Sequence, residues 1–145
     1  MKKINVLFAM LAVVGLATMV AMAGNSDKAT VGFSVENYFS LEIKNGDSVD
    51  FGQVDAFGGP FVKKNGTNLD VKSNTEWSLS TSKSVLLSPA SANESDVLNA
   101  LTVSLETTSG KGNDKDIKVD YTLDNLENLP AGDYVIEVTF TGTSK

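Results

Sequence analysis

The sequence predicts an all-β protein, a single antiparallel immunoglobulin-like β-sandwich of seven to nine strands that follows an N-terminal signal peptide. Three observations lead to this prediction. Apolar residues recur with a period of two in run after run, which is the spacing of a half-buried strand. Turn-forming residues separate the runs. Only one stretch, SPASANESDVLNAL, suits a helical turn, so sheet packed on sheet is the expected architecture.

The chain opens with MKKINVLFAMLAVVGLATMVAMAGN, which has two lysines, an uncharged apolar run and a small-x-small ending at Ala21-Met22-Ala23. This pattern predicts a secretory signal peptide of bacterial type over residues 1–23, cut before Gly24. The alternative is an uncleaved anchor, the only segment through which the chain would contact a membrane. We therefore expect an exported protein, located in the periplasm, at the cell surface or outside the cell.

The remaining segment, 24–145, is long enough for one core and too short for two domains. The signal peptide carries two of the twelve lysines, so its removal moves the formal net charge from −6 to −8. An acidic surface repels phosphate backbones, which argues against a nucleic-acid partner. The chain has no cysteine, so packing and strand pairing must stabilise it without disulfides.

In the first half of this domain, four runs alternate. The apolar positions are Ala29, Val31, Phe33 and Val35, then Phe39, Leu41 and Ile43, then Val49 and Phe51, and later Leu69 and Val71. The dipeptide Asn65-Gly66 lies between two apolar pieces, which predicts a tight hairpin. The first run, Ala29 to Val35, is either the first strand of the sandwich itself or a strand that is donated to another molecule, because the same alternation serves both.

The second half continues the pattern after the helical turn, with a loop at TTSGKGNDKD. The residues expected in the core, or on the face that closes it, are Trp77, Leu79, Ile117, Val119, Tyr121, Ile136 and Val138. The opposite face of the last strand should carry Val135, Glu137 and Thr139. Tyr134 is expected to pack where the turn Pro130-Ala131-Gly132 enters that strand.

Catalytic residue types are scarce. Histidine, cysteine and arginine are all absent, which excludes hydrolase triads, thiol nucleophiles, histidine metal sites and arginine phosphate clamps. The carboxylates occur singly on polar strand faces or in turns, where solvation explains them. We expect no enzymatic activity and no cofactor.

The sequence also contains two weak candidate binding sites, one for calcium and one for a glycan. Asn113, Asp114 and Asp116 could offer oxygens to a calcium ion, although a solvated turn is the favoured interpretation. Trp77 and Tyr38 could offer an aromatic platform to a cell-wall glycan, whereas the alternative for Trp77 is a place in the core.

Two families share features with this chain. The segments VDFGQV, TEWSLSTS and GDYVIEVTFTG resemble the WxL wall-binding surface domains of Gram-positive bacteria, with Trp77-Ser78-Leu79 at the first Trp-x-Leu position. This resemblance implies binding to wall polysaccharide. The C-terminal alternating strand, with Gly132 as the fourteenth residue from the C-terminus, resembles fimbrial subunits and implies assembly by strand donation.

The segment VIEVTFTGT carries one charge, Glu137, and no proline, so an open edge there would invite strand pairing. The expected interface joins Val31, Phe33 and Val35 to Ile136, Val138 and Phe140. The predicted function is a non-enzymatic structural or adhesive subunit of the cell envelope or an extracellular filament. It would associate with itself or with another envelope protein. The alternative is a module that binds wall polysaccharide or another glycan.

Overall fold

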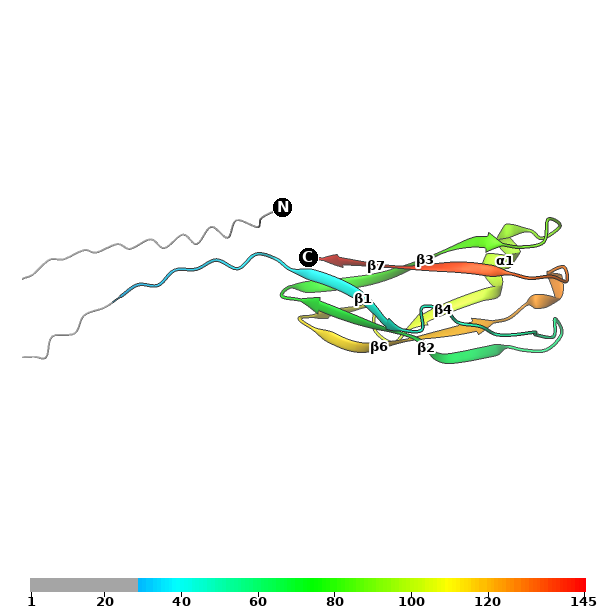
Figure 1. Cartoon of the computed structure of the whole chain (residues 1–145), viewed down its shortest axis with the longest axis horizontal. Coiled ribbons are helices and arrows are strands. Elements are labelled where there is room, and N and C mark those ends of the chain that lie inside the picture. Colours follow the sequence, from blue (N-terminus) through cyan, green and yellow to red (C-terminus); the bar gives the residue numbers. More distant parts are fainter. Residues whose placement is uncertain (1–28) are drawn as a thin grey trace, which may run out of the picture. The chain divides into compact units, whose positions relative to one another are not determined.

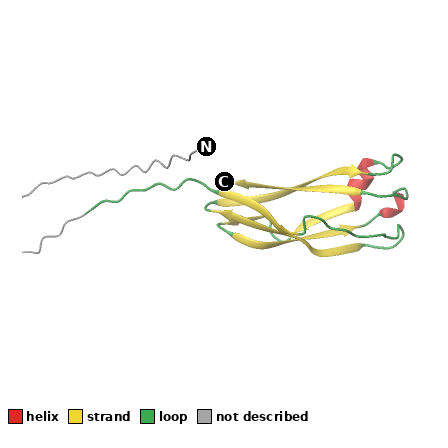
Figure 2. Ribbon diagram, viewed as in Figure 1, coloured by secondary structure: helices red, strands yellow, loops and turns green. Residues whose placement is uncertain are grey.

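A computed structural model describes residues 29–145, and of Lys115 the backbone alone. Figure 2 shows that strands make up most of the described chain. The seven strands are β1 (Phe39–Asn45), β2 (Phe61–Ser73), β3 (Glu76–Leu87), β4 (Leu101–Leu105), β5 (Ser109–Lys111), β6 (Asp114–Leu123) and β7 (Val135–Ser144). Two short helices complete the list, α1 (Glu94–Ala100) and the 3-10 turn η1 (Leu126–Asn128). The all-β prediction is confirmed.

The strands form two antiparallel sheets (Figure 1). One has the order β1-β2-β6-β4 and the other the order β5-β3-β7. The residues buried between them are Leu69, Val71, Trp77, Leu79, Leu101, Ile117, Val119 and Tyr121. Five of the predicted core residues belong to this set, and Ile136 and Val138 are half-buried against it. The predicted alternation of β7 is also confirmed, because Val135, Glu137 and Thr139 are exposed.

The single predicted helical stretch forms α1. Asn93 caps it, with its Oδ1 accepting a hydrogen bond from the Ser95 N–H at 2.9 Å, and Val97 and Ala100 are buried beneath it. At the other end the ammonium group of Lys83 on β3 donates to the carbonyls of Leu98 and Leu101. A lysine at this position satisfies carbonyls that a helix end leaves without partners, so it holds α1 to the second sheet.

The hairpin expected at Asn65-Gly66 is absent, since β2 runs straight through these residues. The ladder with β6 passes from the pair Lys63–Tyr121 to the pair Thr67–Val119, so the dipeptide forms a bulge. Asn65 has a φ of 52° and its N–H donates to Asp120 Oδ1 at 2.7 Å. The common two-residue hairpin turns and some bulges need a residue at positive φ, and Asn-Gly suits either.

The bulge is held by close packing. A Cβ at Gly66 would lie 2.8 Å from Cδ2 of Tyr121, so only glycine fits beneath this ring. The hydroxyl groups of Thr67 and Tyr121 lie 2.6 Å apart, and Thr67 also donates to the Gly46 carbonyl at 2.6 Å. Burial raises the pKa of the Tyr121 phenol above its ordinary value. Together these contacts fasten the loop after β1 to the middle of the first sheet.

Two further expectations are corrected. Val49 and Phe51 form no strand; they pack on the core from the loop between β1 and β2. The predicted loop TTSGKGNDKD contains the short strand β5, which pairs with the start of β3. Both segments are short, and in a short segment the pattern of apolar residues does not distinguish a strand from a loop with buried apolar side chains.

The run from Ala29 to Val35 is not the first strand of the sandwich, because residues 29–38 have no strand and β1 begins at Phe39. All seven strands lie in one compact unit, Asn37–Lys145, and the run belongs to a separate unit. The donated-strand alternative stays a prediction. The predicted signal peptide lies outside the described residues.

Candidate functional site

β7 is an edge strand. It pairs with β3 along its whole length, from Leu87–Val135 to Trp77–Ser144, and within residues 29–145 no strand follows it in the order β5-β3-β7. Its other side therefore presents main-chain N–H and C=O groups outward from the sheet. These groups can pair with an added strand, which makes the edge a potential binding site.

The inward face of β7 is apolar. Ile136, Val138 and Phe140 are half-buried and pack against the core. Further along, Gly142 leaves space for the ring of Phe39, since a Cβ there would lie 2.2 Å from Cζ of that ring. This contact brings the beginning of β1 against the end of β7.

β1 is the corresponding edge strand of the other sheet, so both edges face the same side of the sandwich (Figure 1). A groove of about 340 Å³ lies between them. The residues that line this β1–β7 groove are Leu41, Ile43, Glu137, Val138, Thr139 and Phe140. Ile43 is 43% exposed, which is high for an apolar residue of the inner face of a sheet. The groove thus lies between the unpaired main-chain groups of β7 and the partly exposed apolar side chains of β1.

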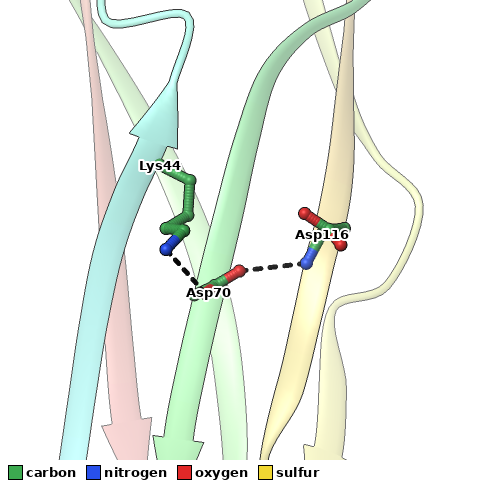
Figure 3. A network of polar contacts seen from close by, with 3 residues as sticks. All are labelled: Lys44, Asp70 and Asp116. Carbon is green, nitrogen blue, oxygen red and sulfur yellow. Dashed lines mark hydrogen bonds and ion pairs between the residues drawn. The ribbon is translucent and has the colours of Figure 1, made fainter.

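A buried carboxylate holds β1 in place as one wall of the groove. Asp70 on β2 is 5% exposed, and its Oδ1 accepts a hydrogen bond from the Asp116 N–H of β6 at 3.1 Å. Its Oδ2 lies 3.8 Å from Nζ of Lys44 on β1 (Figure 3). A buried charge needs such partners, so Asp70 links three neighbouring strands of the first sheet.

The N-terminal half of the predicted interface is solvent-exposed. Val31, Phe33 and Val35 are 83%, 86% and 70% exposed, respectively. Large exposed apolar side chains that gather in one short segment are typical of interaction surfaces. The other half of the predicted interface, in β7, lies in the edge strand of the second sheet.

Trp77, the first candidate for a glycan-binding platform, is buried. Trp77 is 1% exposed and its indole Nε1–H donates to the Gly112 carbonyl at 2.8 Å, so the core interpretation of Trp77 agrees with the structure. Tyr38 is 55% exposed and lies just before β1, without the tryptophan beside it. Glycan binding at Tyr38 stays a prediction.

The calcium candidates are not brought together as a ligand set. Oδ1 of Asn113 accepts a hydrogen bond from the Ser73 N–H at 3.0 Å, while Asp116 contributes its N–H to Asp70. Among the described residues there is no group of three or more histidine, cysteine or acidic side chains that could hold a metal ion. Calcium binding at Asn113, Asp114 and Asp116 stays a prediction.

The sequence did not reveal the β1 wall of the groove. The alternation of Leu41 and Ile43 predicts a strand, but nothing in it shows that the strand has an open side.

In the described part of the chain, no helix is long and apolar enough to cross a membrane. Comparison with protein-family models, with curated proteins and with solved structures gave no match.

Proposed function

We propose that the protein is an exported, non-enzymatic structural or adhesive subunit of the cell envelope or of an extracellular filament, and that it associates with itself by strand pairing. The observation that carries this proposal is the free edge of β7 beside the apolar β1–β7 groove. A strand added there would satisfy main-chain groups and bury apolar surface at once.

The edge lacks the usual protection against pairing. Natural edge strands carry lysine, proline, bulges or inward charges that prevent association. β7 has one charged residue, Glu137, and contains neither proline nor lysine. Its ladder with β3 is regular from Ile136 to Ser144. An edge of this length and regularity favours pairing as its role.

The outward face of β7 is also compatible with contact between acidic molecules. Thr139, Thr141 and Thr143 are exposed and uncharged. With a formal charge of −8 on each copy after removal of the signal peptide, association requires a surface without carboxylates. The part of this face beyond Glu137, from Thr139 to Thr143, provides one.

The experiment uses the chain from Gly24 to Lys145 and compares two double variants. Thr139→Lys/Thr141→Lys puts two charges on the edge strand. Ser80→Lys/Ser82→Lys puts the same charges on the adjacent strand, at positions directly opposite across the ladder. Sedimentation velocity over a range of concentrations measures association.

We expect the parent and the β3 variant to associate, and the β7 variant to associate at least about tenfold more weakly, because lysines at an edge oppose pairing. A parent that stays monomeric at every concentration would overturn the proposal. Equal loss in both variants, or none in either, would show that association does not use this edge.

A further inference from the structure

We infer that the partner of the β7 edge is β7 of a second copy, and that the two strands pair antiparallel about a two-fold axis between their Phe140 residues. This inference rests on the proposed function, because it names the partner for the same edge. The outward main-chain groups of each β7 would satisfy those of the other. The two second sheets would then form one sheet with the strand order β5-β3-β7-β7-β3-β5.

Among the edge strands of the described residues, β7 offers the longest ladder. It has ten residues, whereas β1, β4 and β5 have seven, five and three. β1 also carries Glu42 and Lys44, and its ladder with β2 is irregular between Ile43 and Asn45. Short length, charges and bulges all discourage strand addition. A second β7 is therefore the best partner that another copy can bring to this edge.

The position of the single charge of β7 selects the antiparallel direction. Glu137 lies near the beginning of the strand. Parallel pairing in register would put it beside its counterpart, and like charges directly opposite destabilise a ladder. Antiparallel pairing about Phe140 places Glu137 opposite Thr143 of the other copy. The two carboxylates are then about 20 Å apart at the ~3.3 Å rise of a strand, well beyond the Debye length of about 8 Å at physiological salt.

The regular part of the strand sets the register. The ladder of β7 with β3 has no bulge over residues 136–144, and Phe140 is the central residue of this range. Pairing about Phe140 therefore uses the whole regular part. On the outer face, Thr139 of each copy lies opposite Thr141 of the other, and both are exposed. Opposed threonines are a favourable cross-strand pair, and neither brings a charge.

The inner face of the pair is apolar and covers part of the β1–β7 groove. Val138 would lie opposite Gly142 of the other copy, where the Phe39 ring fills the space that a Cβ would take. The two Phe140 rings would be neighbours at the axis, and aromatic pairs add to the free energy of apolar burial. Val138 and Phe140 both line the groove, so the same pairing that satisfies the main chain reduces its apolar exposure.

A two-fold interface of this kind is closed. Each copy contributes the same strand, and the edge of that strand is then fully used. Association through β7 should therefore stop at two copies. Pairing of β7 with a different segment of a second copy would leave one β7 edge free and would continue to longer chains.

Disulfide trapping tests the direction and the register, because the chain has no cysteine of its own. A copy from Gly24 to Lys145 carrying Thr139→Cys is mixed with a differently tagged copy carrying Thr141→Cys. In the inferred dimer these positions are directly opposite, about 4.5–5.5 Å apart at Cα, within the range for a disulfide. Identical positions are diagonal neighbours at ~7–8 Å, outside the usual range.

We expect mixed disulfide dimers to exceed dimers of either variant with itself by at least about tenfold. The matched control mixes Ser80→Cys with Ser82→Cys, at positions opposite Thr141 and Thr139 on the adjacent strand β3. The two β3 strands would be about 14 Å apart, since three strand spacings separate them, so the control should give at least about tenfold less mixed dimer. Equal trapping from the β3 pair, an excess of dimers between identical positions, or no mixed dimer from the β7 pair would overturn the inference.

Sedimentation velocity of the parent chain separates this inference from the proposed function. We expect a dimer to be the largest species at every concentration. If the parent forms longer chains, and Thr139→Lys/Thr141→Lys abolishes them, the β7 edge is the interface but its partner is another segment; the proposed function then stands and this inference fails. If the parent never associates, both fail.

Discussion

At the scale of single residues, Trp77 is a candidate glycan-binding side chain in the sequence and a core residue in the structure. Its ring is buried, and its N–H is satisfied by the Gly112 carbonyl. Gly110 makes the contact possible, since a Cβ there would lie 2.4 Å from Cζ2 of the indole. The ring thus fixes β5 and its turn against β3, and it is unavailable to a sugar.

Replacement of Trp77 by alanine should lower the free energy of unfolding by ~3–5 kcal/mol, because it leaves a large cavity in the core. This is a large share of the stability of a domain of this size. Urea denaturation of the chain from Gly24 to Lys145 measures the change. The control is Tyr38→Ala, at an exposed ring, for which we expect a change within about 0.5 kcal/mol. An unchanged midpoint for Trp77→Ala would contradict the buried position of the indole.

At the scale of elements, the bulge in β2 decides how the first sheet is built. Asn65 and Gly66 let the chain step outward without leaving the ladder, and Tyr121 on β6 packs over the space that Gly66 leaves. The loop after β1 closes onto the same place, because a Cβ at Gly46 would lie 1.9 Å from the Gly66 carbonyl oxygen. The bulge is therefore a joint between β2, β6 and this loop.

We expect Gly66→Ala to destabilise the protein by ~1–3 kcal/mol, because the added methyl group collides with the Tyr121 ring in a packed interior. Thermal unfolding monitored by circular dichroism measures the effect. Gly32→Ala is the control, since a Cβ at Gly32 has nothing within 4 Å, and it should leave the melting temperature unchanged. Equal stability of both variants would show that the Tyr121 ring moves aside freely.

At the scale of the whole molecule, net charge and the open edge act in opposite directions. The segment 24–145 has a formal charge of −8, which would keep copies of it apart. In the proposed assembly, the β7 edge would attract them over a short distance through main-chain pairing and apolar contact. The balance between the two depends on how far the charges act, and this distance is set by salt.

Association should therefore strengthen as ionic strength rises from about 0.01 M to about 0.15 M, over which the Debye length falls from about 30 Å to about 8 Å. Light scattering at fixed protein concentration follows the change. The Ser80→Lys/Ser82→Lys variant, with a formal charge less negative by two, should show a weaker salt dependence. Association that weakens as salt is added would mean that opposite charges hold the copies together, and would contradict pairing through the uncharged edge.

The sequence by itself determined which side chains face inward. Alternation with a period of two placed Trp77, Leu79, Ile117, Val119 and Tyr121 in the core, because side-chain direction along a strand is a local property. It also showed that the last strand has almost no protective charge, and composition alone removed the side chains on which most catalytic sites depend.

Only the tertiary structure decided which strands are neighbours. The pairing of β7 with β3 joins residues far apart in the chain, and many pairings bury the same apolar faces equally well, so local pattern cannot choose among them. For the same reason Asn65-Gly66 could not be resolved into a bulge, nor Leu41 and Ile43 into the wall of a groove. The open edge arises where no further strand of the described residues pairs with β7, which is a property of the fold and not of the local pattern.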